Sequence, residues 1–301
     1  MYWVHVLPAA IYFARLVMNQ VPIASSGTAG GPESRSYFFY RHPVAVRLTH
    51  WIGVISMTIL LMSGLQIFNA HPALYFGQIS DFEHPVLAIG TLQRDGHLMG
   101  AVQIAGHTFN TTGFLGLSGD GDTHAFPSWA VLPRDQDLGG GRRWHFFFAW
   151  LLVLDGLFYL AYSLASGHAW RDLIPSREQL RTIGSSILDH LRLRFAHGEE
   201  ARSYNVLQRL TYALILFIVI PLLILAGLTM SPGLDSAFPW LTALLGGRQT
   251  ARTIHFICAF LIVAFVVVHL IMVVLSGTWN NLRSMVTGWY AIQTEAGRHG
   301  E

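Results

Sequence analysis

The stretch that decides the fold is Thr253–Ser276, TIHFICAFLIVAFVVVHLIMVVLS, which carries no charged residue but contains two histidines, His255 and His269. As an α-helix this stretch extends about 36 Å, enough to cross a hydrocarbon core of about 30 Å. The histidines are fourteen residues apart. Because that is close to four helical turns, their rings face nearly the same way, about 21 Å apart along the axis. Ionisable residues inside a membrane are costly and usually functional, so we predict a spanning helix with two functional imidazoles.

Three further stretches, Leu48–Phe68, Trp144–Gly167 and Val206–Met230, are long and apolar enough to cross a bilayer. Only 12% of the chain is charged and 52% is hydrophobic, whereas soluble domains carry about 25% charged residues. Pro221 predicts a kink in the third span. The predicted fold class is therefore all-α integral membrane, a bundle of four transmembrane helices.

The distribution of arginine predicts the orientation of these spans. With the N-terminus inside, residues 1–47, 168–209 and 277–301 face the cytoplasm and hold thirteen of the nineteen basic residues, all of them arginine. Cytoplasmic segments carry the excess of positive charge in membrane proteins. We therefore predict that both termini are cytoplasmic. The net charge is only +2, and without a basic patch interleaved with aromatic residues we expect no binding to nucleic acid.

Two other histidines begin spans, and the orientation gives their depths. His50 begins the first span at the inner face, and His145 begins the second at the outer face. His255 lies near the outer face and His269 near the inner one. One iron cannot be shared over about 21 Å, so the depths pair His145 with His255 and His50 with His269. We predict two bis-histidine haems stacked across the bilayer, although each histidine alone would be read as a structural residue.

The type of haem follows from the cysteine content. Cys258, the one cysteine, lies inside the fourth span, and the chain has no Cys-x-x-Cys-His attachment motif. Both haems are therefore predicted to be haem b, held without covalent bonds. Arg142 and Arg143 border the outer haem site and Arg47 the inner one, and each is a candidate partner of a haem propionate. Anchoring of the helix ends is the alternative role for these arginines.

Two other polar residues of the second span each have two possible roles. His168, at the inner end of the second span, is either a rival haem ligand or a residue near a quinone. Asp155 lies in the middle of the second span and either belongs to a proton route or bonds a neighbouring helix. Four glycines would let a haem or another helix approach the backbone, namely Gly53, Gly64, Gly156 and Gly227.

The outer loop, about residues 69–141, is too long to be structureless. Val86–Leu92 and His97–Ile104 are apolar or alternating and flank Arg94-Asp95-Gly96. Because Asp-Gly between two such runs indicates a hairpin, we predict a small periplasmic domain with a β-hairpin. The histidines of this loop have no standard metal-ligand spacing, and no metal site is predicted from them: His71, His84, His97, His107 and His124.

The inner loop and the ends of the chain complete the organisation. Ser176 and Gln179 match a capping box, and residues 176–195 are predicted to form an amphipathic helix on the cytoplasmic surface. Trp279–Tyr290 is a second such segment. Residues 1–24 are an interfacial helix, a signal-like segment, or translation upstream of a start at Met18. We predict an N-terminal segment and linker (1–36), a membrane domain (37–290) and a tail (291–301).

Motifs at three of the spans resemble those of a known family. The motifs are Arg47-Leu48-Thr49-His50-Trp51, Gly141-Arg142-Arg143-Trp144-His145, and Arg252-Thr253-Ile254-His255 with His269 fourteen residues on. They resemble the bacterial di-haem cytochrome b family that includes the thiosulfate reductase and Ni/Fe-hydrogenase cytochrome b subunits. The thiosulfate-reductase branch is the most similar, with Asn69-Ala70-His71-Pro72 after the first span. The resemblance covers roughly residues 39–290.

This resemblance implies that His50, His145, His255 and His269 ligate two haem b groups in the bacterial inner membrane. It also implies electron exchange between quinone, an exchangeable substrate, and a periplasmic oxidoreductase, often a molybdenum enzyme of the sulfite-oxidase type in this branch. Such a subunit would have quinone/quinol oxidoreductase activity, with the other substrate's chemistry in the partner. The long outer loop departs from hydrogenase-type relatives, which disfavours a hydrogenase partner.

Two other functions stay open from the sequence. A self-sufficient oxidoreductase would act on a small molecule at the outer haem and would need no partner. A membrane anchor without haem would use the histidines structurally and would be colourless.

Overall fold

The computed structural model describes residues 21–22, 35–134, 136–181, 183–191 and 205–294. Most of the N-terminal segment predicted at 1–36 therefore lies outside the described residues. The chain forms two compact units. Unit 1 contains Met1–Thr49, Ala161–Ala213 and Val266–Glu301, and unit 2 contains His50–Leu160 and Leu214–Phe265.

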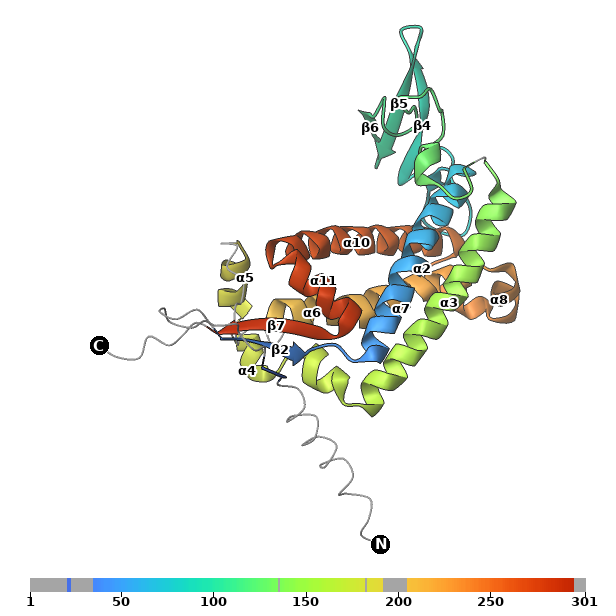
Figure 1. The fold of residues 1–301 in the computed structure, drawn as a ribbon. Coiled ribbons are helices and arrows are strands. Elements are labelled where there is room, and N and C mark those ends of the chain that lie inside the picture. The colour runs from blue at the N-terminus through green and yellow to red at the C-terminus, as the bar shows by residue number, and fades with distance from the viewer. Residues whose placement is uncertain (1–20, 23–34, 135, 182, 192–204, 295–301) are drawn as a thin grey trace. The chain divides into compact units, whose positions relative to one another are not determined.

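Among the described residues, four helices are long and apolar enough to cross a membrane, which confirms the predicted fold class (Figure 1). They are α2 (Val44–Asn69), α3 (Leu138–Ala165), the segment Val206–Thr229, and α10 (Arg248–Leu275). The segment Val206–Thr229 contains α6 (Val206–Leu214), the π turn η4 (Ile215–Val219) and α7 (Ile220–Thr229).

Three spans begin earlier than their apolar runs predict, and α2 begins at Val44 rather than Leu48. In the other two, polar groups and glycines define the first turn. Helix α3 begins at Leu138 rather than Trp144, since the Asp137 side chain accepts a hydrogen bond from the Gly140 N–H at 2.7 Å. Helix α10 begins at Arg248 rather than Thr253. It follows Gly246 and Gly247, whose φ angles of 79° and 105° suit glycine.

The third span is irregular where Pro221 predicts a kink. Proline has no N–H, so the carbonyl of Phe217 loses its helical partner. The π turn Ile215–Val219 lies directly before the proline, and α7 resumes at Ile220. A widened turn of this kind is a frequent form of helix irregularity.

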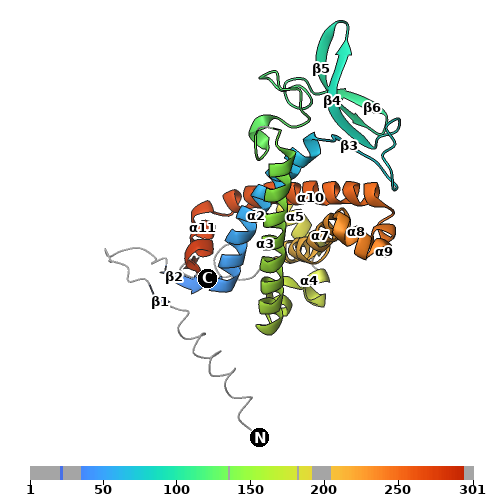
Figure 2. The ribbon, with the colours of Figure 1, turned by 90° about the vertical axis from the view of Figure 1, so that its right-hand side faces the viewer.

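A four-stranded antiparallel sheet occupies part of the loop between α2 and α3 (Figure 2). Its strands follow the order β3 (Ala73–Leu74), β4 (Leu87–Arg94), β5 (His97–Ile104) and β6 (His107–Asn110). The predicted hairpin is confirmed, with Asp95 and Gly96 at positive φ between the paired Arg94 and His97. Strand β6 follows a second such turn at Ala105-Gly106. The sequence pattern misses that turn because alanine is not typical of it.

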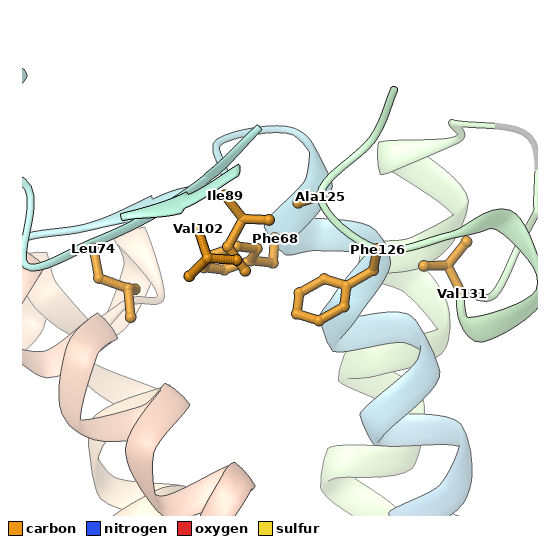
Figure 3. Close-up of a cluster of buried hydrophobic side chains, with 7 residues drawn as sticks. All are labelled: Phe68, Leu74, Ile89, Val102, Ala125, Phe126 and Val131. Carbon is orange, nitrogen blue, oxygen red and sulfur yellow. The ribbon is translucent and has the colours of Figure 1, made fainter. Parts of the chain in front are cut away.

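The sheet and the helix ends share one apolar core. Phe68, near the C-terminal end of α2, is buried with Ile89 of β4 and Val102 of β5 (Figure 3). The remaining buried members are Leu74, Ala125, Phe126 and Val131. Phe256 of α10 packs against this core, with its ring centroid 4.9 Å from that of Phe68. The sheet is therefore part of the packing of unit 2.

Unit 1 contains a three-stranded sheet in the order β1 (Val21–Pro22), β2 (Arg35–Tyr40), β7 (Trp289–Thr294). Helix α11 (Thr278–Thr287) ends at Gly288, at φ 90°, so the predicted amphipathic segment Trp279–Tyr290 continues into strand β7. The boundaries predicted at residues 36 and 290 both fall inside paired strands. Aromatic residues alternate weakly there, and such short strands give little signal in a sequence.

The amphipathic helix predicted at 176–195 is present as α4 (Arg177–Arg181) and α5 (Ile183–Leu191), with residues 182 and 192–195 outside the described part. The capping box is confirmed. The Ser176 N–H donates to Gln179 Oε1 at 3.0 Å, and the Gln179 N–H donates to Ser176 Oγ at 3.2 Å.

Two glycines of the four-stranded sheet provide a matched test of its packing. A Cβ at Gly100 would collide with the Leu115 carbonyl oxygen and lie 2.8 Å from the Leu117 nitrogen. A Cβ at Gly90, on the neighbouring strand, would meet nothing within 4 Å. We expect Gly100→Ala to destabilise the sheet by about 1–3 kcal/mol, the usual cost of overpacking, and Gly90→Ala to be tolerated. Limited proteolysis of residues 111–118 in the purified protein measures this. Equal cleavage of the two variants would contradict the packing.

Candidate functional site

His145 lies on α3 with its ring against α2. Its Nδ1 is 3.1 Å from Ser63 Oγ, and the backbone of Leu60 is a further partner of the ring. The Ser63 hydroxyl donates its own hydrogen to the Ile59 carbonyl at 2.7 Å, so the serine oxygen is left to accept from the imidazole. The hydrogen of His145 is therefore on Nδ1, and Nε2 keeps its lone pair.

His255 on α10 has the same tautomer for a different reason. Its Nδ1 lies 2.8 Å from the Leu223 carbonyl oxygen, on α7. A carbonyl oxygen only accepts hydrogen bonds, so Nδ1 must carry the hydrogen. Both imidazoles thus have Nε2 available as a ligand atom.

Two of the four glycines noted in the sequence make room for these rings. A Cβ at Gly64 would lie 3.3 Å from His145 Cε1, and one at Gly227 would lie 3.1 Å from His255 Cε1. The other two have different surroundings, since Gly53 faces the carboxylate of Asp155 at 3.8 Å and Gly156 meets nothing within 4 Å. At Gly64 and Gly227 the group that approaches the backbone is therefore an imidazole.

The spacing of the two rings fits one shared iron. The ring centroids of His145 and His255 are 6.1 Å apart. With about 2.0 Å for each metal–nitrogen bond and about 1.1 Å from Nε2 to the ring centre, two imidazoles on one metal have centroids about 6.2 Å apart. No group of three or more His, Cys, Asp or Glu side chains suited to a metal ion occurs among the described residues. Two imidazoles without further protein ligands suit an iron whose other four ligands come from a porphyrin.

The other predicted ligands lie in different units. His50, on α2, belongs to unit 2 and has its ring centroid 5.4 Å from that of Trp51, while His269, on α10, belongs to unit 1. Their pairing stays a prediction from the sequence.

The predicted propionate partners have unequal surroundings. Arg47 donates from Nη1 to the Val286 carbonyl, and its buried Nε has no hydrogen-bond partner among the described residues. Arg142 and Arg143 are exposed, and the Arg142 guanidinium lies 5.7 Å from the Phe146 ring centre. Their role toward haem also stays a prediction.

His168 is buried and forms a pair with Asp172. His168 Nδ1 lies 2.8 Å from Asp172 Oδ2, which also accepts from Arg171 Nε at 3.1 Å. Burial alone would raise the pKa of Asp172, but the hydrogen bonds from His168 and Arg171 outweigh burial and hold that pKa below its usual value. An ionised carboxylate therefore orients the His168 ring.

Sequence reasoning missed Ser63 and the Leu223 carbonyl. A backbone carbonyl gives no signal in a sequence. Ser63 does have a sequence signal, because a serine next to Gly64 inside an apolar span predicts a close polar approach by a neighbouring helix.

Four membrane-crossing helices with two imidazoles spaced for one iron define a membrane haem protein. The model of the family described as prokaryotic cytochrome b561 matches residues 41–288, and the chain belongs to this family. The putative protein-methionine-sulfoxide reductase subunit YedZ1 of Azospira oryzae is 32% identical over 234 residues, which cover 78% of this chain and 90% of the relative. No solved structure matches the chain. The family confirms the predicted cytochrome b class and, with it, haem b as the cofactor.

Ser63 allows a direct test of how His145 is held. We expect Ser63→Ala to speed haem loss by about tenfold, the low end for groups that hydrogen-bond a metal ligand, because the Leu60 backbone remains near the ring. Transfer of haem to excess apomyoglobin measures the rate. Ser56→Ala is the matched control, since Ser56 lies on the same helix, is equally buried, and has a hydroxyl without a partner among the described residues. Similar rates in the two variants would show that the Ser63 hydroxyl does not hold the ring.

Proposed function

We propose that this chain is a di-haem cytochrome b, a membrane subunit that passes electrons between the quinone pool and a periplasmic oxidoreductase. His145 and His255 hold the outer haem, and His50 and His269 hold the inner one. The observation that carries the proposal is the His145–His255 pair, with a centroid separation of 6.1 Å and both Nδ1 atoms bonded to neighbouring helices.

Bound haem b supplies a one-electron Fe(III)/Fe(II) couple. The chain's own groups hold and orient the ligands. The Ser63 oxygen and the Leu223 carbonyl accept from the two Nδ1–H groups, which fixes the tautomer and the orientation of each ring. Around Leu223, an apolar cluster keeps water from the His255 side of the site; its buried members are Ile215, Val219, Leu223, Cys258 and Ile262.

The partner is proposed to be a periplasmic oxidoreductase, and a molybdenum enzyme of the sulfite-oxidase type is the expected class. The name of the Azospira oryzae relative, a putative subunit of a protein-methionine-sulfoxide reductase, supports a reductase partner. The loop between α2 and α3 exposes several large apolar side chains that a partner could cover. They are Phe76, Ile79, Phe82, Phe109, Phe114 and Trp129.

The inner end is proposed to react with quinone. Quinol oxidation releases protons, so a quinone site needs a base. The His168–Asp172 pair suits this role, because the carboxylate of Asp172 accepts from His168 Nδ1 at 2.8 Å and orients the imidazole. The arginine distribution supports a bacterial inner-membrane location in which this end and both termini are cytoplasmic.

Haem content in histidine variants tests the ligand scheme. We expect His145→Ala and His255→Ala to lose the same haem, so that the double variant loses no more than either single one. His50→Ala and His269→Ala should lose the other haem. Pyridine haemochrome assays and reduced-minus-oxidised spectra of the purified protein measure both, with the exposed His84→Ala as a control that keeps two haems. A colourless wild-type protein would favour the anchor, and additive losses would overturn the pairing.

The proposed reaction with quinone has a separate test. We expect Asp172→Asn to slow reduction of the haems by a soluble quinol by about 100-fold, within the usual range for a general base, while haem content and dithionite reduction stay unchanged. Glu178→Gln, an exposed carboxylate in the next helix, is the matched control. If both variants accept electrons from quinol at the wild-type rate, the His168–Asp172 pair is not the base.

A further inference from the structure

Arg252 is a partly buried cation without a matching anion. It lies on α10, where Nη1 donates to the Ala73 carbonyl at 3.0 Å and Nη2 donates to the His71 carbonyl. No aspartate or glutamate lies within ion-pair distance of it in the part of the chain that the structure describes. Carbonyl oxygens satisfy two of its hydrogens but leave its charge uncompensated, and a guanidinium away from water is normally paired.

His71 lies beside this cation and has an unpaired nitrogen. Its Nε2 is buried and has no hydrogen-bond partner among the described residues. The His71 ring contacts two aromatic rings that also contact each other, with centroid distances of 5.7 Å to Tyr75 and 5.8 Å to Phe82. Burial, together with the charge of Arg252, lowers the pKa of His71. A buried unpaired polar atom is rare and calls for a partner outside the protein.

Arg252, which donates to the His71 carbonyl, lies close along the chain to a proposed haem ligand. Arg252 precedes His255 by three residues on α10, and residues three apart share a helix face. The Arg252 guanidinium lies 5.7 Å from the Phe68 ring centre, and Phe68 in turn packs against Phe256, the residue after His255. The guanidinium of Arg252, which has no anionic partner among the described residues, and the unpaired Nε2 of His71 suit a bidentate carboxylate.

We propose that Arg252 and His71 form a carboxylate-binding site that takes a propionate of the haem held by His145 and His255. This inference rests on the proposed function, because it requires that haem. It assigns a propionate of the outer haem to a partly buried pair, Arg252 on α10 and His71 in the loop after α2, rather than to the exposed Arg142 and Arg143. The positive charge of Arg252 then stabilises the ferrous state and raises the potential of that haem.

The experiment compares variants of the purified two-haem protein by redox titration and by resonance Raman spectroscopy of the propionate bending modes. The outer haem is identified as the component lost in His255→Ala. We expect Arg252→Gln to lower the outer midpoint potential and to shift the propionate band. His71→Phe keeps an aromatic ring against Tyr75 and Phe82 and leaves the backbone carbonyls in place. It should shift the band with a smaller change in potential.

Arg248→Gln is the matched control, because it removes the same charge one turn earlier on α10, where Arg248 bonds the Met230 carbonyl. Wild-type behaviour in this control supports a local site, and equal potential shifts in both arginine variants would overturn it. If Arg252→Gln fails to fold, Arg252→Lys and His71→Phe test the site instead. Arg252→Lys is expected to keep the midpoint potential and to shift the propionate band.

Two further outcomes would overturn the assignment. One is an unchanged propionate band in both Arg252→Gln and His71→Phe while two haems are present. The other is a midpoint potential that changes with chloride or formate concentration in the wild-type protein but not in Arg252→Gln. That result would indicate that the site binds an exchangeable anion. Absence of the outer haem from the wild-type protein would instead refute the proposed function.

Discussion

A neutral imidazole has one donor nitrogen and one acceptor nitrogen, and inside a membrane neither can be left to water. In this protein the donors of His145 and His255 are both tied to neighbouring helices, by the Ser63 hydroxyl and the Leu223 carbonyl. That leaves one acceptor on each ring, and the ring separation of 6.1 Å suits a single iron as the shared partner. The tautomers and the helix contacts of both rings follow from satisfying their donor nitrogens, and the acceptor nitrogens are the atoms that the proposed haem iron would bind.

The two rings donate to different kinds of acceptor, a serine hydroxyl for His145 and a backbone carbonyl for His255. The Leu223 carbonyl is a backbone group four residues before Gly227, so it is also the normal acceptor for the Gly227 N–H in α7. The imidazole shares that acceptor, and Gly227 leaves space for the ring. A substitution at Leu223 keeps the carbonyl, whereas a substitution at Ser63 can remove the acceptor of His145. The two proposed haem ligands are therefore affected by different changes in sequence, because only the acceptor of His145 belongs to a side chain.

The sequence predicts the features that depend on composition and on local turns. The four spans, the Asp95-Gly96 hairpin and the Ser176–Gln179 capping box are confirmed, because apolar length and turn chemistry act within a few residues. Depth alone paired His145 with His255, and the rings do lie together. Strands β2 and β7 were missed, since their pairing joins residues about 250 positions apart. Ser63 and the Leu223 carbonyl were missed because their contacts come from tertiary packing.

The sheet between α2 and α3 shares its core with the residues around the His145–His255 pair. Phe68 is five residues after Ser63, Phe256 follows His255 directly, and both pack with strands β4 and β5. The carbonyls of His71 and Ala73, at the start of the same loop, accept from Arg252. Interiors packed this closely transmit displacement rather than absorb it. A protein that bound this sheet would therefore contact a core that includes Phe256, the residue after His255, and Phe68, on the same helix as Ser63.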